Sequence, residues 1–231
     1  MNIVFIPGWG MKGEIFASLA YSLSDLGTVS FVEWEGIETV SFFHERAKQA
    51  LHARSVLIGW SLGSLVALEM AHENPELVSH LVLIGGTSRF VMAEGYDAGW
   101  HPRIVERMKK QLQRHPGETI HAFLASLLAE EENADLSDYF HRDRTKELLI
   151  GLDYLLTADA RSLLPEIHVP MLLIHGERDA ICPPDASRYI AARARAATLA
   201  LLSNTGHVPF VTKTDECAQL IQWFVGEKDD R

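Results

Sequence analysis

The chain has 231 residues, 47% of them hydrophobic, and carries a formal net charge of −10 at pH 7. This length gives room for one domain with a large core, and no apolar run approaches the ~20 residues that a membrane span needs. The acidic balance provides no overall attraction to nucleic acid or anionic lipid, so we expect neither a nucleic-acid nor a membrane partner.

Six apolar runs predict strands that are buried on both faces, as in a parallel sheet. In chain order they are Asn2–Ile6, Thr28–Glu33, Arg54–Gly59, Ser79–Gly85, Pro170–His175 and Thr198–Leu202. Helical patterns separate them at Glu14–Ser24, Thr39–His52, Leu62–Glu73, Pro184–Ala194 and Asp215–Val225. This alternation predicts an α/β fold with a mostly parallel, six-stranded sheet flanked by helices.

The alternation is interrupted once, between the fourth and fifth predicted strands. Strand patterns are absent there, and helical patterns occur at Arg103–Arg114, Glu118–Glu131 and Thr145–Thr157. We interpret residues 88–165 as a helical insertion that forms a cap over a core of residues 1–87 and 166–231.

The stretch Gly59-Trp60-Ser61-Leu62-Gly63 stands between an apolar strand and an Ala/Leu-rich helix. A strand, a G-x-S-x-G turn and a helix form the context of a nucleophile elbow, where small neighbours make room for a sharp bend. Ser61 is therefore the candidate nucleophile. The alternative interpretation is a serine that only caps the helix.

A reactive serine needs a general base within reach and an acid that orients this base. Of the eleven histidines, His207 alone lies beyond the last predicted strand in a loop framed by glycine and proline. Asp179 follows the fifth strand, with Glu177 as the alternative acid. Sites form where parallel strands end, and the chain order Ser61, Asp179, His207 is that of α/β-hydrolases.

Acyl transfer at Ser61 also needs two backbone N–H groups that face the developing oxyanion. Leu62 begins a helix, so its N–H has no partner within that helix. The loop Pro7-Gly8-Trp9-Gly10 follows the first strand and would supply the second donor from Trp9. The alternative for this loop is a plain glycine-rich turn.

The helical insertion contains two further sets of candidate residues. Apolar side chains would cover the acyl chain of a substrate; they are Phe123, Leu124, Leu127, Leu128 and Phe140. Basic side chains at helical spacing would dock an acidic carrier protein; they are Arg103, Arg107, Lys110 and Arg114. The other interpretation of the basic set is a solvated helix face.

These motifs together resemble the α/β-hydrolase superfamily over nearly the whole chain, as HGERDAICPP and NTGHVPF illustrate. Gly8-Trp9-Gly10, Trp60 before the serine and the stretches 123–127 and 151–161 resemble the biotin-pathway carboxylesterases, which hydrolyse the methyl ester of pimeloyl-acyl-carrier protein. The resemblance implies an acyl-chain channel at residues 123–127. It also implies a triad and two oxyanion donors, which are Ser61, Asp179, His207, Trp9 and Leu62.

Two features depart from that family. Pro7-Gly8 stands where the family has His-Gly in the oxyanion loop. Acidic residues lie near the implied channel and would repel an acidic carrier; they are Glu118, Glu130, Glu131, Glu132 and Asp135.

The compartment follows from the cysteines and the amino terminus. MNIVFIPGWG lacks the basic and long apolar segments of a secretion signal. Cys182 and Cys217 are far apart without metal-ligand spacing, and they fit free thiols in a reducing compartment. We expect a cytoplasmic monomer without metal or organic cofactor.

The sequence thus predicts a serine carboxylesterase that acts on a small-molecule or carrier-linked acyl ester, with pimeloyl-acyl-carrier protein methyl ester as the substrate implied by the resemblance. Three alternatives stay open, because a fold does not fix chemistry. They are a broad-specificity short-chain carboxylesterase, a lactone or carbon–carbon bond hydrolase, and a non-catalytic small-molecule receptor. No physical role for Trp60 follows from the sequence.

Overall fold

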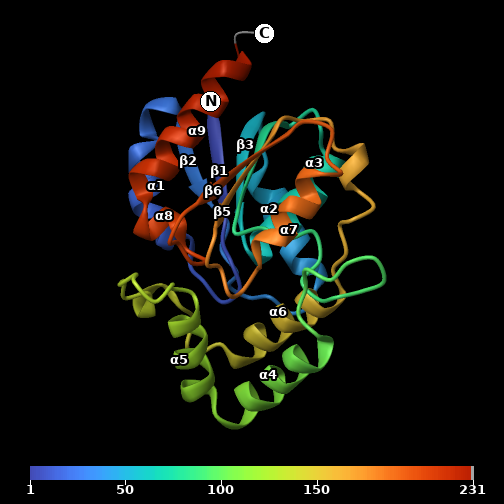
Figure 1. Ribbon diagram of the computed structural model, residues 1–231, viewed down its shortest axis with the longest axis vertical. Coiled ribbons are helices and arrows are strands. Elements are labelled where there is room, and N and C mark those ends of the chain that lie inside the picture. Colours follow the sequence, from blue (N-terminus) through green and yellow to red (C-terminus); the bar gives the residue numbers. More distant parts are fainter. Residues whose placement is uncertain (230–231) are drawn as a thin grey trace.

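The computed structural model describes residues 1–229 and contains a six-stranded sheet whose neighbouring strands are all parallel. The strand order is β2-β1-β3-β4-β5-β6, with helices on both sides of the sheet (Figure 1). The strands are β1 (Asn2–Ile6), β2 (Thr28–Phe31), β3 (Ser55–Trp60), β4 (Val78–Ile84), β5 (Met171–Gly176) and β6 (Ala197–Leu202). The predicted fold class, a six-stranded α/β sheet flanked by helices, is confirmed.

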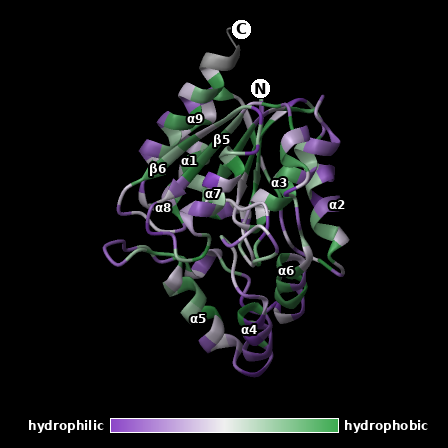
Figure 2. Cartoon of the chain, turned by 45° about the vertical axis from the view of Figure 1, so that its right-hand side comes forward, coloured by the Kyte–Doolittle hydropathy of each residue, from purple (hydrophilic) through white to green (hydrophobic). Residues whose placement is uncertain are grey.

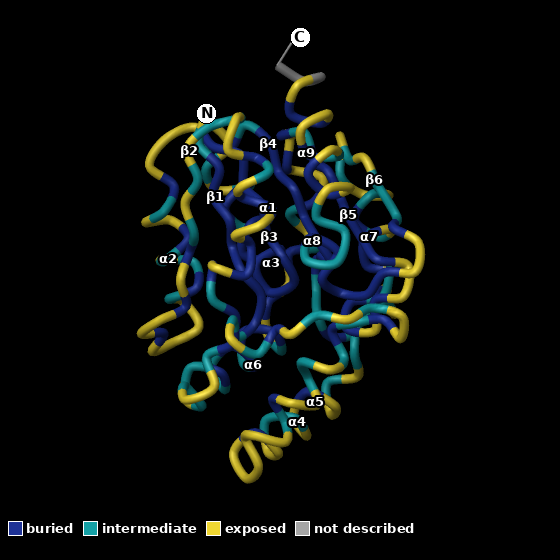
Figure 3. Tube along the Cα trace, turned by 90° about the vertical axis from the view of Figure 1, so that its left-hand side faces the viewer, coloured by how far each residue is buried: buried dark blue, intermediate teal, exposed yellow. Residues whose placement is uncertain are grey.

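Burial accounts for the composition of the strands. β3 and β5 lie inside the sheet and are buried at every residue, because helices cover both faces and leave no side for polar groups. The edge strands β2 and β6 are only partly buried. Figure 3 shows this gradient as dark blue central strands between lighter edges.

Helices of the core cover the two faces of the sheet. Figure 1 shows α1, α8 and α9 on one face and α2, α3 and α7 on the other. Their bounds are α1 (Ala17–Ser22), α2 (Ser41–Ala50), α3 (Leu62–Glu73), α7 (Pro184–Ala191), α8 (Pro209–Thr212) and α9 (Thr214–Asp229). Within residues 1–229 no helix has both the length and the hydropathy needed to cross a membrane.

The predicted helix Glu14–Ser24 is broken into shorter pieces. A 3-10 turn at Gly13–Phe16 precedes α1, and a second 3-10 turn at Ser24–Leu26 follows it. The Gly13 amide donates to the Glu33 carboxylate at 3.0 Å, so a contact with the segment after β2 holds the first turn. Tertiary contact therefore overrides the local helical pattern at this position.

The helical insertion, residues 88–165, contains α4 (Pro102–Arg114), α5 (Pro116–Ser126) and α6 (Thr145–Thr157). Figure 1 shows these helices beyond the carboxyl ends of the strands. Hydrophilic residues occupy much of α4 (Figure 2). Pro116 separates α4 from α5, because a proline disfavours helical geometry at the residue before it, and His115 is non-helical with φ −138°.

Helix α5 ends at Ser126, whereas the sequence pattern predicted a helix to Glu131. The carbonyl of Leu127 accepts a hydrogen bond from the amide of His207 at 2.8 Å. The Ala129 amide donates to the side chain of Glu132 at 2.8 Å. These bonds satisfy backbone groups that a longer helix would have paired internally, so the helix stops.

The two ends of the helical insertion meet at the core. The Ala160 amide donates to the Ser88 carbonyl at 2.8 Å, and Arg89 Nη1 lies 2.5 Å from Asp159 Oδ2. Further along, the Tyr154 hydroxyl of α6 donates to Glu69 of α3 at 2.9 Å. Backbone and side-chain bonds together therefore hold the insertion against the core.

Candidate active site

Ser61 occupies the bend between β3 and α3 in a backbone conformation that costs energy. Its φ is +54° and its ψ is −118°, in the region that favours glycine. A Cβ atom on Gly59 would lie 2.5 Å from the Gly63 carbonyl oxygen, and one on Gly63 would lie 2.1 Å from that of Ile6. Both flanking glycines are therefore required by the close approach of backbone.

Ser64, which the sequence reasoning missed, holds this bend from the first turn of α3. Its hydroxyl donates to the Ser61 carbonyl at 2.5 Å and accepts from the Thr87 amide at 3.1 Å. The hydroxyl thus links the bend to the loop after β4. The available signal was its position three residues after Ser61, where a side chain of the next turn lies against the bend.

Asp179 and His207 form a buried pair at the ends of β5 and β6. His207 Nδ1 lies 2.7 Å from Asp179 Oδ2, and both side chains have no exposed surface. Asp179 Oδ1 accepts from the amides of Ile181 at 2.8 Å and Cys182 at 2.9 Å. The alternative acid, Glu177, is exposed. The structure therefore brings Asp179, and not Glu177, to His207.

The charge state of this pair follows from its surroundings. Burial by itself raises the pKa of Asp179, but the positive charge of His207 and hydrogen bonds from His175 and His207 outweigh burial and hold this pKa below its usual value. Asp179 is then ionised and accepts the proton on Nδ1. When His207 is neutral, this leaves the lone pair on its Nε2, which is buried and has no hydrogen-bond partner within residues 1–229.

His175 is a second histidine against the same carboxylate. Its Nε2 lies 3.2 Å from Asp179 Oδ2 and 2.7 Å from the Cys182 carbonyl, so this nitrogen carries the proton. Its Nδ1 lies 2.6 Å from the Ser187 hydroxyl. His175 therefore helps to hold Asp179 in place.

The loop after β1 packs directly on the bend at Ser61. A Cβ atom on Gly8 would lie 3.0 Å from the Trp60 ring and 3.3 Å from Ser61 Cβ. The Trp34 indole donates to the Pro7 carbonyl at 3.1 Å, which holds the loop where the sequence has Pro-Gly. Neither the Trp9 nor the Leu62 amide donates to a protein group among the hydrogen bonds of residues 1–229.

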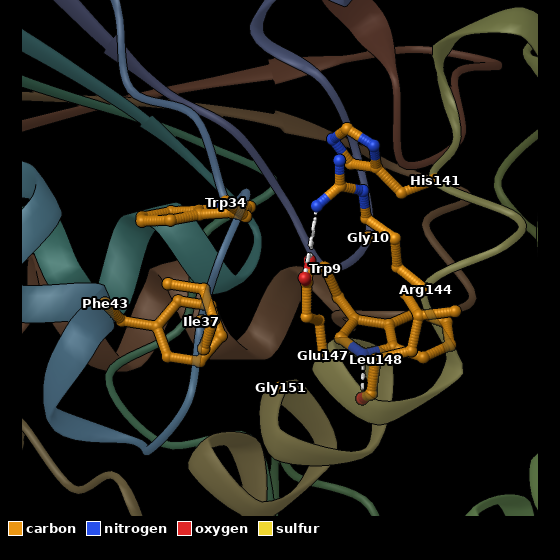
Figure 4. Close-up of a pocket in the computed structure, with 10 residues that line it drawn as sticks. All are labelled: Trp9, Gly10, Trp34, Ile37, Phe43, His141, Arg144, Glu147, Leu148 and Gly151. Carbon is orange, nitrogen blue, oxygen red and sulfur yellow. Dashed lines mark hydrogen bonds and ion pairs between the residues drawn. The ribbon is translucent and has the colours of Figure 1, made fainter.

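The Trp9 side chain connects this loop to the helical insertion. Its indole donates to the Leu148 carbonyl of α6 at 2.8 Å, and its ring meets Phe123 edge-on at 4.8 Å. Figure 4 shows the cleft around Trp9, which Trp34 and the ion pair of Arg144 with Glu147 also line. This cleft of about 10 Å³ has room for about one water, so it is no substrate site.

A model of the alpha/beta hydrolase family matches residues 3–220 of the chain. The chain belongs to this family. The hydrolase is 34% identical to a pimeloyl-[acyl-carrier protein] methyl ester esterase of Stenotrophomonas maltophilia, over 97% of its own length and 92% of the relative's. A protein of the same name from Neisseria meningitidis is 31% identical over 97% and 93% of the two chains.

A solved structure agrees with this fold at lower identity. The hydrolase superimposes on an esterase from Exiguobacterium antarcticum with a TM-score of 0.86 and 19% identity, covering 97% of its chain and 91% of the esterase. At this identity the likeness supports the fold alone.

Trp60, whose role the sequence left open, supports the loop of the hydrolase that carries His207. Its indole Nε1 donates to the His207 carbonyl at 2.8 Å, and the two rings lie 5.5 Å apart. The Trp60 side chain is 1% exposed and also packs on Phe210. The residue before Ser61 thus contacts the backbone of His207.

The apolar candidates of the helical insertion are distributed over different places. Phe123 lines an apolar cavity of about 350 Å³ between α4 and α5, together with Ile181, which lies two residues beyond Asp179. Leu124 and Leu128 line a separate cavity of about 170 Å³. Leu127 is fully buried, and Phe140 packs on the Trp9 ring. Of the five, only Phe123 lines the cavity beside the Asp179 loop.

Proposed function

We propose that this hydrolase is a serine carboxylesterase in which Ser61 is the nucleophile, His207 the general base and Asp179 the residue that orients the base. The observation that carries the proposal is the buried His207, whose Nδ1 lies 2.7 Å from Asp179 Oδ2 and whose Nε2 has no hydrogen-bond partner within residues 1–229. Ser61 at a strained bend beside Trp60 supports the role of nucleophile.

In the proposed mechanism, Ser61 Oγ attacks the ester carbonyl while His207 Nε2 accepts the hydroxyl proton. The amides of Trp9 and Leu62 donate to the oxyanion. Collapse of the tetrahedral intermediate breaks the ester bond, and the imidazolium of His207 returns the proton to the leaving alkoxide. Water then attacks the acyl-enzyme as His207 accepts its proton, and a second collapse releases the acid and restores Ser61.

We further propose that residues 88–165 act as a cap over the core of residues 1–87 and 166–231, and that the cavity at Phe123 receives an acyl chain. Aromatic and aliphatic side chains line this cavity; they include Phe90, Trp100, Met108, Phe123 and Ile181. A partly open apolar space of this kind suits a hydrocarbon chain whose ester end reaches the triad.

The proposed substrate is the methyl ester of a pimeloyl group on acyl-carrier protein, the substrate named for the relatives. Four basic residues of α4 are exposed and form no ion pair within residues 1–229; they are Arg103, Arg107, Lys110 and Arg114. Ile104 and Met108 of the same helix line the apolar cavity. An acidic carrier on the basic stripe would therefore sit beside the cavity that takes its acyl chain.

The two cysteines fit the same proposal. Cys182 and Cys217 are free and buried, which supports a cytoplasmic enzyme.

Two of the acidic residues near the proposed channel have partners of their own. Glu131 lies 3.4 Å from Arg178, and Glu132 accepts a hydrogen bond from the Gly206 amide. These contacts reduce the repulsion that the acidic residues of the sequence would exert on an acidic carrier.

The proposal is tested by assaying hydrolysis of a short-chain aryl ester with the wild type and Ser61→Ala. We expect a loss of about 10⁴-fold or more in kcat, because removal of the nucleophile removes the acylation step. Circular dichroism provides the control for folding. If Ser61→Ala keeps most of the activity, the mechanism is wrong. Rescue of a biotin auxotroph that lacks its pimeloyl-ester esterase then tests the substrate.

A further inference from the structure

Glu132 belongs to an acidic run in the sequence but turns toward the core in the structure. Its Oε2 accepts from the amides of Ala129 and Gly206, each at 2.8 Å. Its Oε1 accepts from the Thr212 hydroxyl of α8 at 2.5 Å. One half-buried carboxylate of the helical insertion therefore joins two segments of the core, before and after His207.

The segment that carries Glu132 contacts the His207 loop through backbone as well. The His207 amide donates to the Leu127 carbonyl at 2.8 Å. A Cβ atom on Gly206 would lie 2.7 Å from both the Leu127 carbonyl oxygen and the Ala129 amide nitrogen. Only glycine fits this contact, so the helical insertion and the loop touch without intervening side chains.

The backbone of His207 is thus held from two sides. Its amide and that of Gly206 donate to the helical insertion, whereas its carbonyl accepts from the Trp60 indole of the core at 2.8 Å. The ring makes one hydrogen bond through Nδ1, to Asp179, and Nε2 has no partner within residues 1–229. The position of Nε2 therefore depends on these backbone contacts.

We propose that Glu132 is a positioning residue for His207, through which the helical insertion sets the reach of the base toward Ser61. This inference rests on the proposed function, since it takes His207 as the base. Two amides on one carboxylate oxygen make charge-assisted hydrogen bonds, which are stronger than neutral ones. A displacement of about 1 Å at a reacting group lowers a rate by about 100-fold.

The test compares Glu132→Ala with Glu130→Ala on a small aryl ester, which needs no carrier. Glu130 is the matched control, because it lies in the same acidic run, is exposed and loses the same charge. We expect Glu132→Ala to lower kcat by about 10- to 100-fold with KM unchanged, and Glu130→Ala to match the wild type. Thr212→Val and Glu132→Gln each remove part of the contact, and we expect smaller losses in kcat.

A double-mutant cycle with His207→Ala separates this role from a general effect on folding. If Glu132 acts through His207, Glu132→Ala causes no further loss in the His207→Ala background, where residual hydrolysis remains measurable. A loss that persists in this background overturns the inference, as does a kcat of Glu132→Ala equal to that of Glu130→Ala. If His207→Ala itself keeps wild-type activity, the proposed function fails instead, so the two failures are distinct.

Discussion

The bend at Ser61 in the core and helix α4 in the helical insertion are held in place by different kinds of contact. In the core, Ser61 is placed by backbone packed so closely that a single added carbon at Gly63 would lie 2.1 Å from a carbonyl oxygen. In the insertion, α4 is largely exposed, and Lys109 joins it to Asp153 of α6 by a side-chain ion pair. Close backbone packing places Ser61, and side-chain bonds hold α4, whereas the insertion meets the core through both backbone and side-chain bonds.

This difference separates two effects of mutation. A change in the core beside the proposed triad displaces groups that we propose to act on every ester, so we expect it to change the rate with every substrate. A change on the outer face of α4 leaves those groups in place and alters only which substrates arrive. Mutations at Glu132 and Trp9 are expected to affect both regions, because each residue joins the insertion to a loop of the core.

Among the effects that distinguish the two regions, the largest concerns the insertion alone. Simultaneous charge reversal of Arg103, Arg107 and Arg114 to Glu is expected to lower kcat/KM by about 100-fold on a carrier-linked ester, because attraction of the acidic carrier becomes repulsion. The same variant should hydrolyse a short aryl ester at the wild-type rate. Steady-state kinetics at low and high salt measures both. An unchanged rate on the carrier-linked ester would contradict docking on α4.

A smaller effect is expected in the core and for all substrates. Trp60→Phe keeps a ring against Phe210 but removes the hydrogen bond to the His207 carbonyl, leaving that buried oxygen unpaired. We expect kcat to fall by about 10-fold on carrier-linked and aryl esters alike, since about 1–3 kcal/mol is lost at the His207 loop. Trp223→Phe is the control, because Trp223 is 46% exposed. A loss of activity on only one of the two esters would contradict the expectation that a change at the His207 loop affects all substrates.

The smallest effect is a pH dependence of stability with opposite signs at two carboxylates of the core, Glu69 on the side facing the insertion and Asp179 at the proposed site. Burial raises the pKa of Glu69, which faces Tyr154 of the insertion, so the folded state binds this proton more tightly. The stability that Glu69 contributes is present below its unfolded pKa of about 4.3 and falls as pH rises through the folded value. For Asp179, whose folded pKa is lowered, the contribution is present above about pH 3.9 and falls as pH decreases.

Urea unfolding of Asp179→Asn and Glu69→Gln beside the wild type measures these two slopes. Below about pH 4 the wild type should lose its advantage over Asp179→Asn, and above about pH 4.3 it should lose stability relative to Glu69→Gln. Slopes of the same sign for the two variants would show that the carboxylates do not differ as described.

The sequence predicted the core well, because its signals are local. Helix α3 begins and ends at the predicted residues, and Asp179 and His207 were found because each follows a strand at the same sheet edge. The sequence favoured Asp179 as the acid with Glu177 as the alternative, and the contact with His207 distinguishes the two. Their assignment as a triad stays a proposal until it is measured.

The insertion was harder to predict, because its decisive contacts join residues far apart in the chain. The end of α5 depends on a hydrogen bond between Leu127 and His207, and no local pattern contains it. Composition marked Leu124 and Phe123 as equivalent apolar residues, yet they line different cavities. Glu132 was grouped with exposed acidic neighbours, since its partners Gly206 and Thr212 lie more than seventy residues away.

The hydrogen bond between Ser88 and Ala160 has a consequence for the length of the segment between them. Because the two ends of the helical insertion are hydrogen-bonded neighbours, a much shorter or longer segment can join β4 to β5 without disturbing the strand order. A transplanted segment from a relative would still have to supply an acceptor for the Gly206 amide and one for the Trp9 indole. The insertion therefore leaves and rejoins the core at one place, and a replacement segment must keep these two acceptors.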